Sequence, residues 1–163
     1  MKGNSMKIRY DIDVKKDGIS YINMYSKANT AFGRMLSNFY PYTIHTEDGT
    51  FRSVEAYWYY LSLPASVNKD SIRRLYGYQA KKKGRELRAE AGEDNLLFDD
   101  RFEEKILSAI RQKVQANTSL FKKEYKNLPI IHYYFFDGKQ FDVTDDFPWL
   151  IDGITEIVKS IQP

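Results

Sequence analysis

Apolar residues recur at helical spacing in several parts of the chain. A basic helix is predicted from Tyr78 to Arg88, and the polar stretch that begins at Gly92 ends it. The longest helix is predicted over residues 99–116, with an apolar side made of Phe102, Ile106, Ala109, Ile110 and Val114. A last helix follows Trp149, and its core face carries Ile151, Ile154, Ile157, Val158 and Ile161.

Alternation of apolar and polar residues predicts strands elsewhere. Residues 7–26 predict strands on either side of a turn at Asp17-Gly18, and residues 41–46 predict a short strand that ends in the turn 47–49. The apolar run 129–136 is typical of a buried strand. After it, Asp137-Gly138 turns the chain so that residues 141–143 pair back.

The remaining segments are predicted to be loops and short helices. Residues 26–33 are small and polar and predict a loop. Asn68 or Asp70 is expected to cap a short helix through Leu75, with Gly77 stopping it. The fold class is therefore predicted to be α+β, a mostly helical single domain over residues 7–163 with a small β-sheet. Residues 1–6 are expected to be a leader or disordered and receive no role.

Composition narrows the class of protein. The chain has 163 residues, of which 42% are hydrophobic and 29% charged, as in a soluble globular domain. Aromatic residues reach 15%, which suits either a pocket for a ring-bearing ligand or a tyrosine-rich core. The net charge of +3 gives the protein a weak electrostatic attraction for phosphate groups.

Several kinds of chemistry are not expected. There is no cysteine, which excludes disulfides and thiolate chemistry and agrees with a cytoplasmic location. No apolar run approaches the ~20 residues of a membrane span. The two histidines, His45 and His132, lack ligand-spaced partners, so neither a metal site nor a cofactor is predicted.

Glu55 is the most informative candidate for chemistry. It lies in a predicted helix from Ser53 to near Pro64 whose apolar residues do not keep to one face, which is typical of a buried helix. It is the only acid between Asp48 and Asp70. Desolvation would raise the pKa of such a carboxyl group toward the range of a general acid or base at neutral pH. Alternatively, Glu55 occupies a solvent-exposed strip in the first turn of the helix.

A family resemblance favours the first alternative. It is carried by three segments: Leu36-Ser-Asn-Phe-Tyr-Pro41, Asp48-Gly49 and Ser53-Val-Glu-Ala-Tyr57. Together they resemble the pattern of the NADAR (YbiA-like) family of N-glycosidases, which cleave a ribose–nitrogen bond. Their substrates are ADP-ribosylated guanine or early intermediates of the riboflavin pathway. The resemblance implies a YbiA-like fold and places the catalytic glutamate of the family at Glu55.

The resemblance also implies further site residues. Asp146 and Trp149 match an Asp-x-x-Trp pattern near the C-terminus, where the aspartate would assist catalysis and the tryptophan would bind substrate. Alternatively, Asp146 is a loop residue that caps the last helix, and Trp149 fills the core. The other substrate-binding candidates are Lys27, Arg34, Ser37, Asn38, Phe39, Trp58, Arg85 and Phe98. Arg85 is expected to contact phosphate, with Lys27 and Arg34 as alternatives.

Three departures from the family pattern indicate a divergent member. Ser62 stands where the family has a lysine, Phe98 stands where a tryptophan is common, and a Gly/Asn segment is shortened to Leu150-Ile-Asp-Gly153. They indicate an altered substrate preference or a loss of turnover.

The sequence therefore predicts an N-glycosidase whose partner is an ADP-ribose-containing nucleotide or ADP-ribosylated nucleic acid, with guanine-linked ADP-ribose preferred. The alternatives are cleavage of a ribosylamine phosphate of the riboflavin pathway, a catalytically silent ADP-ribose or nucleotide binder, and a tyrosine-rich nucleic-acid-binding domain. The oligomeric state is left open.

Overall fold

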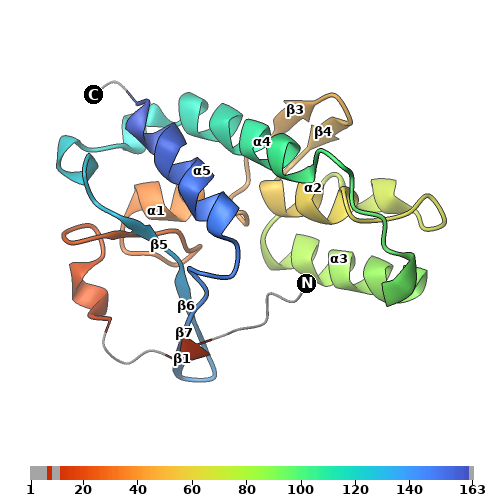
Figure 1. Cartoon of the computed structure of the whole chain (residues 1–163), viewed down its shortest axis with the longest axis horizontal. Helices are drawn as coiled ribbons and strands as arrows, with labels where there is room; N and C mark the ends of the chain where they lie inside the picture. The colour runs from red at the N-terminus through yellow and green to blue at the C-terminus, as the bar shows by residue number, and fades with distance from the viewer. Residues whose placement is uncertain (1–6, 9–11, 162–163) are drawn as a thin grey trace. The chain divides into compact units, whose positions relative to one another are not determined.

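The computed structural model describes residues 7–8 and 12–161, and it confirms the α+β class (Figure 1). The helices are α1 (Ala31–Leu36), α2 (Val54–Tyr60), α3 (Gly77–Ala91), α4 (Phe102–Ala116) and α5 (Pro148–Lys159). The chain divides into two compact units. One is Asn38–Lys113, and the other combines the described residues up to Ser37 with those from Val114 onward. Each unit is described by itself.

The unit Asn38–Lys113 contains the two helices that carry the predicted chemistry. Its antiparallel hairpin joins β3 (Ile44–Thr46) to β4 (Gly49–Phe51) and leads directly into α2. A 3₁₀ turn, η2 (Lys69–Ile72), then connects α2 to α3. Helices α2 and α3 lie side by side (Figure 1). The core of this unit holds Ile44, Phe51, Tyr57 and Ile72, all almost fully buried.

The other unit is built on two small sheets. The first is antiparallel, in the order β1 (Lys7–Ile8), β7 (Lys139–Asp142) and β6 (Tyr133–Phe136). The second pairs β2 (Ile22–Asn23) in parallel with β5 (Ile130–Ile131). Helix α1 packs near β2, and α5 packs near β5. Its core is formed by apolar side chains that are almost fully buried: Ile22, Met24, Phe32, Met35, Ile154 and Ile157.

Several predicted elements are confirmed. The basic helix lies within α3, the long amphipathic helix is α4, and the last helix is α5. Turns at Asp48-Gly49 and Asp137-Gly138 close the two hairpins, and Asp137 and Gly138 both take the positive φ (53° and 72°) that tight hairpin turns require. Each of these segments is specified by its own local sequence, either by a regular spacing of apolar residues or by a turn dipeptide.

Other predictions of local structure are wrong. Strands β2 and β1 do not pair with each other: β2 pairs with β5, β1 pairs with β7, and Val14–Lys16 forms a 3₁₀ turn. The loop predicted over 26–33 ends early, because the Thr30 hydroxyl accepts a hydrogen bond from Gly33 N and caps α1.

The predicted strand 129–136 and the short helix after Asn68 also differ. The strand divides at His132 into β5 and β6, which belong to different sheets, and Phe136 is 69% exposed instead of buried. The short helix is only the 3₁₀ turn η2, and Gly77 opens α3 instead of stopping a helix. The proposed leader at residues 1–6 lies outside the described residues, and the single domain over 7–163 stays a prediction.

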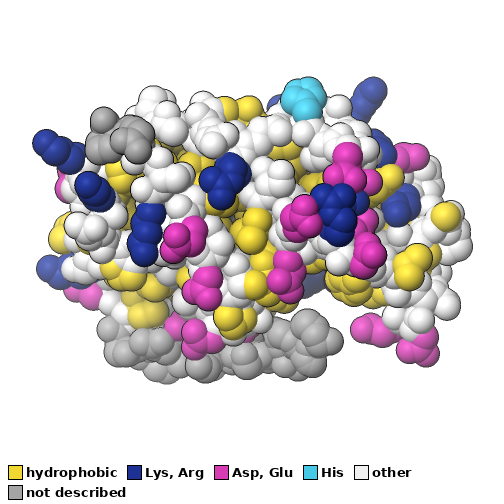
Figure 2. Space-filling model, turned by 45° about the horizontal axis from the view of Figure 1, so that its top comes forward, with side chains coloured by type: hydrophobic (Ala, Val, Ile, Leu, Met, Phe, Trp, Pro, Cys, Tyr) yellow, Lys and Arg dark blue, Asp and Glu magenta, His cyan; other side chains and the backbone are white. Residues whose placement is uncertain are grey.

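The surface mixes the two signs of charge. Figure 2 shows basic and acidic side chains interspersed on one face, with apolar side chains between them. The net charge of +3 is therefore not spread over this face as a uniform basic surface. In the described part of the chain, no helix has the length and apolar character needed to cross a membrane.

Candidate functional site

Glu55 lies in the first turn of α2, at a position fixed from both sides. The Ser53 hydroxyl caps the helix by accepting a hydrogen bond from Ala56 N at 3.1 Å. The backbone N–H of Glu55 donates to the carbonyl oxygen of Asn38 at 2.9 Å. The Glu55 side chain remains partly exposed, yet burial raises the pKa of its carboxyl group from 4.5 to about 7. Glu55 is therefore desolvated but still reachable.

Three cations on α3 oppose this rise in the pKa of Glu55. They are Lys81, Arg88 and Arg85, and their positive charges favour the carboxylate. Their spacing, i, i+4 and i+7, puts all three on one face of α3. The Glu55 carboxyl forms no hydrogen bond or ion pair with any described residue, so it is available to a substrate. The face of α3 toward Glu55 suits an anionic ligand.

Arg88 is held against the position where the family pattern has a lysine. Its Nε and Nη2 both donate to the hydroxyl oxygen of Ser62, at 3.1 and 2.9 Å. Its guanidinium carbon lies 4.5 Å from the centroid of the Tyr59 ring and 5.6 Å from that of Phe98. Ser62 is fully buried, so it serves as an anchor for Arg88. A cation is thus present beside residue 62 although the lysine is not.

The predicted loop Ser37-Asn38-Phe39 spans the boundary between the two units. Ser37 is buried at the end of α1, where its N–H donates to Arg34 O. The carbonyl oxygen of Phe39 accepts from Gly77 N at 3.1 Å, at the start of α3. The side-chain oxygen Oδ1 of Asn38 is buried and accepts no hydrogen bond from any described residue. A buried acceptor without a donor is costly unless a ligand supplies one.

Asp146 and Trp149 belong to the other unit. Asp146 is half-buried, and its N–H donates to Val143 O at 3.1 Å. The ring of Trp149 packs edge-to-face on Phe147, with centroids 6.4 Å apart. The last helix begins with Pro148 after Phe147, without a side-chain cap. Asp146 therefore does not occupy the N-cap position of α5, which is taken by Phe147.

Lys27 and Arg34 also lie in that other unit. Lys27 is exposed and lines a cavity of about 230 Å³ together with Asp17 and Asn23. Nη1 of Arg34 donates to two backbone carbonyls, those of Ala28 at 2.7 Å and Asn29 at 3.2 Å. Arg34 thus has a structural role in the loop before α1.

Two aromatic candidates lie in the unit of Glu55. Trp58 is half-buried and packs edge-to-face on Phe102, with centroids 5.0 Å apart. Phe98 is 51% exposed and contacts both Phe102 and Arg88. Phe98 therefore keeps an aromatic face open to solvent beside a cation, as a stacking surface for a base requires.

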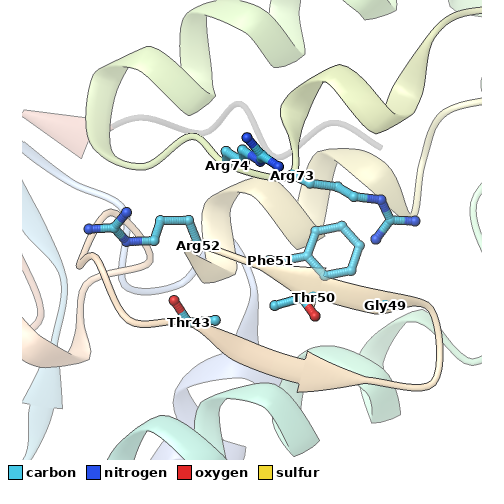
Figure 3. A pocket seen from close by; sticks show the side chains of 7 residues that line it. All are labelled: Thr43, Gly49, Thr50, Phe51, Arg52, Arg73 and Arg74. Carbon is cyan, nitrogen blue, oxygen red and sulfur yellow. The ribbon is translucent and has the colours of Figure 1, made fainter.

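A larger cavity of about 620 Å³ also lies in the unit Asn38–Lys113 (Figure 3). Its lining residues are Thr43, Gly49, Thr50, Phe51, Arg52, Arg73 and Arg74. Sequence reasoning gave these arginines no role. Glu55 lines neither this cavity nor the smaller one. Its assignment as a catalytic candidate therefore rests on its contacts and on the charges around it.

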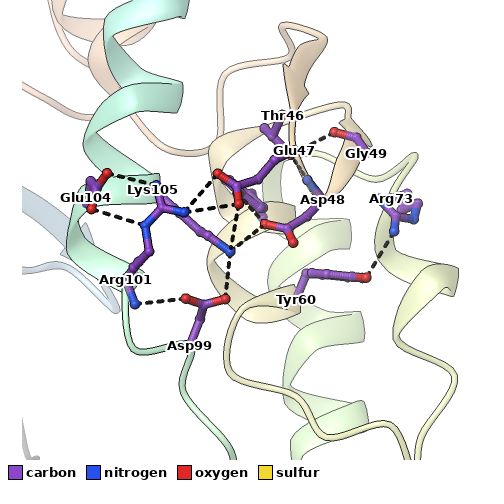
Figure 4. Close-up of polar contacts among 11 residues, drawn as sticks. Thr46, Glu47, Asp48, Gly49, Tyr60, Arg73, Asp99, Arg101, Glu104 and Lys105 are labelled. Carbon is purple, nitrogen blue, oxygen red and sulfur yellow. Dashed lines mark hydrogen bonds and ion pairs between the residues drawn. The ribbon is translucent and has the colours of Figure 1, made fainter.

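The turn at Asp48, which is part of the family pattern, proves to be structural. The Asp48 carboxylate accepts a hydrogen bond from the Tyr57 hydroxyl at 2.7 Å. It also accepts one from Lys105 Nζ at 3.1 Å (Figure 4). Lys105 also donates to Asp99 at 2.7 Å. Burial opposes the charge of Lys105, but the two carboxylates hold its pKa above the usual value. This network fixes the β3–β4 hairpin on α2 and α4.

No cluster of three or more potential metal ligands occurs in residues 7–8 and 12–161. The Glu55 site offers a reachable carboxyl group on α2, three cations on α3 and the exposed aromatic face of Phe98, which precedes α4. This set can accept a proton and can bind phosphate. Lys81 and Arg88 belong to the predicted basic helix and share the helical face of Arg85, although the sequence assigned only Arg85 to the site.

Comparison with solved structures defines the class: the chain is an α+β protein with the YbiA-like fold. The similar structure is the NMR structure of the E. coli protein YbiA, with a TM-score of 0.57 over 91% of this chain and 92% of that one. Sequence identity is 17%, so the likeness establishes the fold alone. The sequence matches no family model, and no curated protein matches it significantly.

Proposed function

We propose that the chain is an N-glycosidase that hydrolyses a ribose–nitrogen bond and, most specifically, removes ADP-ribose from guanine. One observation carries the proposal: the Glu55 carboxyl, with its pKa raised to about 7 by burial, faces Lys81, Arg85 and Arg88 without forming an ion pair among the described residues. The YbiA-like fold supports the same class of activity.

In the proposed reaction, water attacks the anomeric carbon of the ribose as the carbon–nitrogen bond breaks. The Glu55 carboxylate accepts a proton from the water and stabilises the positive charge that develops on the sugar. The nitrogen leaves with the bonding electrons and takes up the proton that Glu55 gained from the water, while Asp146 is proposed to orient the ribose hydroxyls or the attacking water. The products are ADP-ribose and the base.

Substrate contacts are assigned on the same grounds. Arg85, with Lys81 and Arg88, would bind the diphosphate, because three cations exceed what one phosphate needs. Asn38 Oδ1, buried without a partner among the described residues, would accept from a sugar hydroxyl or a base. Ser37, Phe39, Trp58, Phe98 and Trp149 are proposed to shape the rest of the pocket, and Lys27 and Arg34 are secondary phosphate contacts.

The test is release of guanine from ADP-ribosylated guanine by the wild type, Glu55→Gln and the control Glu86→Gln. Glu86 is an exposed acid on α3 and lies outside the proposed site. We expect release by the wild type and the control, and a loss of at least about 100-fold in Glu55→Gln. Because the carboxylate is the active form, kcat/KM should rise with pH through about 7. Release by Glu55→Gln at the rate of the wild type would refute the assignment.

A second candidate function, a silent ADP-ribose binder, is favoured by the serine at position 62. Calorimetry with ADP-ribose separates the two functions. Binding of ADP-ribose without any release of base would establish the binder. Cleavage of a ribosylamine phosphate, in place of the ADP-ribose adduct, would instead identify a one-phosphate substrate.

A further inference from the structure

The cavity of about 620 Å³ shares no lining residue with the Glu55 site, and its lining is rich in arginine. Its walls come from Thr43 just before β3, from β4 with Arg52 just after it, and from the segment between η2 and α3 (Figure 3). Three of the seven lining residues, Arg52, Arg73 and Arg74, carry a guanidinium group, and no acidic residue lines the cavity. Thr43 and Thr50 add hydroxyl groups. Such a lining suits an anion with many oxygen acceptors.

Arg73 is fixed in place but not fully satisfied. Its Nε donates to Asp70 at 2.8 Å and its Nη2 to the Tyr60 hydroxyl at 3.0 Å. Its guanidinium carbon lies 4.6 Å from the ring centroids of both Phe51 and Tyr60. Nη1 is buried and has no hydrogen-bond acceptor among the described residues. An orphaned donor costs about 1–3 kcal/mol, and an oxyanion beside Arg73 would remove that cost.

Arg52 and Arg74 carry charges that no described carboxylate neutralises. Both residues are exposed, and neither forms an ion pair within residues 7–8 and 12–161. Arg52 instead lies over the ring of Tyr76, 5.2 Å from its centroid, and Tyr76 is 46% exposed. The carboxylate of Asp70 compensates Arg73 in part. The cavity therefore keeps about two uncompensated positive charges beside an open aromatic ring.

We propose that this cavity, with Tyr76 at its side, binds the backbone of a single-stranded nucleic acid. The cavity is several times larger than one phosphate, and its guanidinium groups come from two separate segments of the chain, as suits successive phosphates. An exposed tyrosine next to cations gives a base a surface on which to stack. The binding does not require the hydrolase reaction, so it stands or falls separately from the function proposed above.

The test is fluorescence anisotropy with an unmodified, labelled DNA strand of about 12 nucleotides, within the site sizes of known single-strand grooves. The variant Arg52→Ala/Arg74→Ala is compared with the control Lys122→Ala/Lys126→Ala, which removes two exposed cations outside the cavity. We expect the arginine variant to lose at least about tenfold in affinity at low salt. Its plot of log affinity against log salt should flatten by about 1.4, because the variant would neutralise two fewer phosphates of the single strand.

Two further arms make the outcome decisive. Tyr76→Phe should keep the affinity and Tyr76→Leu should lose several-fold, because only the ring is needed for stacking. Inorganic phosphate and AMP should compete poorly at matched phosphate concentration. Equal losses in the arginine variant and the lysine control, or no binding by the wild type, would overturn the proposal. Equal competition by AMP would overturn it as well, because it would indicate a small-anion site.

Base release from free ADP-ribosylated guanosine should stay unchanged in Arg52→Ala/Arg74→Ala, which separates this site from Glu55.

Discussion

The carboxyl group of Glu55 lies in an environment that disfavours its ionised form. Burial raises the pKa of Glu55 to about 7, although three cations on α3 favour the charged form. A carboxyl group that half-ionises at neutral pH can exchange a proton with a substrate, and the same environment makes the carboxylate costly to the fold. Function and stability should therefore respond in opposite directions when Glu55 is replaced.

The first prediction concerns stability. Between pH 4.5 and 7 the folded state keeps a proton on Glu55 that the unfolded state has lost, so this group lowers stability as the pH rises through that window. Glu55→Gln should therefore be more stable than the wild type at pH 8, by about 2 kcal/mol given the partial exposure of Glu55. The two proteins should be equal near pH 4. Urea unfolding at both pH values measures this.

Another buried group titrates in the same range. Burial lowers the pKa of Lys113 to about 7, so the absolute stability of either protein also changes with pH. The informative quantity is thus the difference between Glu55→Gln and the wild type, in which the contribution of Lys113 cancels. A difference that is the same at pH 4 and pH 8 would show that Glu55 is not desolvated.

The second prediction concerns Arg88, which we infer to supply positive charge beside Glu55 where the family pattern has a lysine. Arg88→Ala removes a charge that lowers the pKa of Glu55, so the pH profile of kcat/KM should shift upward. The rate near pH 7 should fall by about tenfold or more. Arg88→Lys should restore part of the rate and of the profile, since it keeps the charge but not the paired contact with Ser62.

A purely structural role for Arg88 would have a different outcome. Arg88→Ala would then lower the melting temperature and the amount of active enzyme, but the pH profile of the remaining activity would keep its midpoint. The exposed Arg111 on α4 provides a control, because Arg111→Ala removes an equal charge elsewhere in the chain.

At the scale of elements, the site depends on how closely α2 approaches α3. Gly84 is buried in the middle of α3, and a Cβ atom there would overlap the ring of Tyr59 on α2. The glycine therefore sets the distance at which Lys81, Arg85 and Arg88 face Glu55. A glycine inside a helix is otherwise unfavourable, by about 1 kcal/mol relative to alanine.

The third prediction is that Gly84→Ala destabilises the protein despite its better helix propensity. Overpacking against Tyr59 should cost about 1–3 kcal/mol, and the propensity gain offsets only part of this. Activity per folded molecule should also fall, because the cations on α3 move away from Glu55. The reverse change at the exposed Ala89, Ala89→Gly, measures the propensity term alone. An increase in stability on Gly84→Ala would contradict the close packing of α2 and α3.

The same elements show what could be predicted from the sequence. The period of α4 and the Asp137-Gly138 turn are local signals, so these parts were predicted correctly. Strands β2 and β5 are two residues long and pair across more than a hundred residues, with Ile22 opposite Ile130, and no local pattern encodes such a pairing. The desolvation of Glu55 followed from its apolar helix, but the arginine cavity did not. Arg52 and Arg74 meet there only because their separate segments fold together.

At the scale of the whole molecule, the proposed site residues are distributed over both units. Glu55 and its cations lie in Asn38–Lys113, whereas Asp146 and Trp149 lie in the other unit. The chain passes from one unit to the other between Ser37 and Asn38, inside the loop that carries the family resemblance. The assignment of Asp146 as the partner of Glu55 therefore requires a functional measurement.

A double-mutant cycle supplies that measurement as the fourth prediction. If Glu55 and Asp146 act on the same bond in one step, removing either should forfeit most of the joint effect, so Glu55→Gln/Asp146→Asn should be little slower than Glu55→Gln alone. Single-turnover release of base gives the four rates, and ADP-ribose affinity verifies that each variant still binds. Asp145→Asn serves as the matched control, because it removes the neighbouring charge. If the effects of Glu55→Gln and Asp146→Asn instead multiply, Asp146 acts independently of Glu55, and its assignment as the partner of Glu55 is wrong.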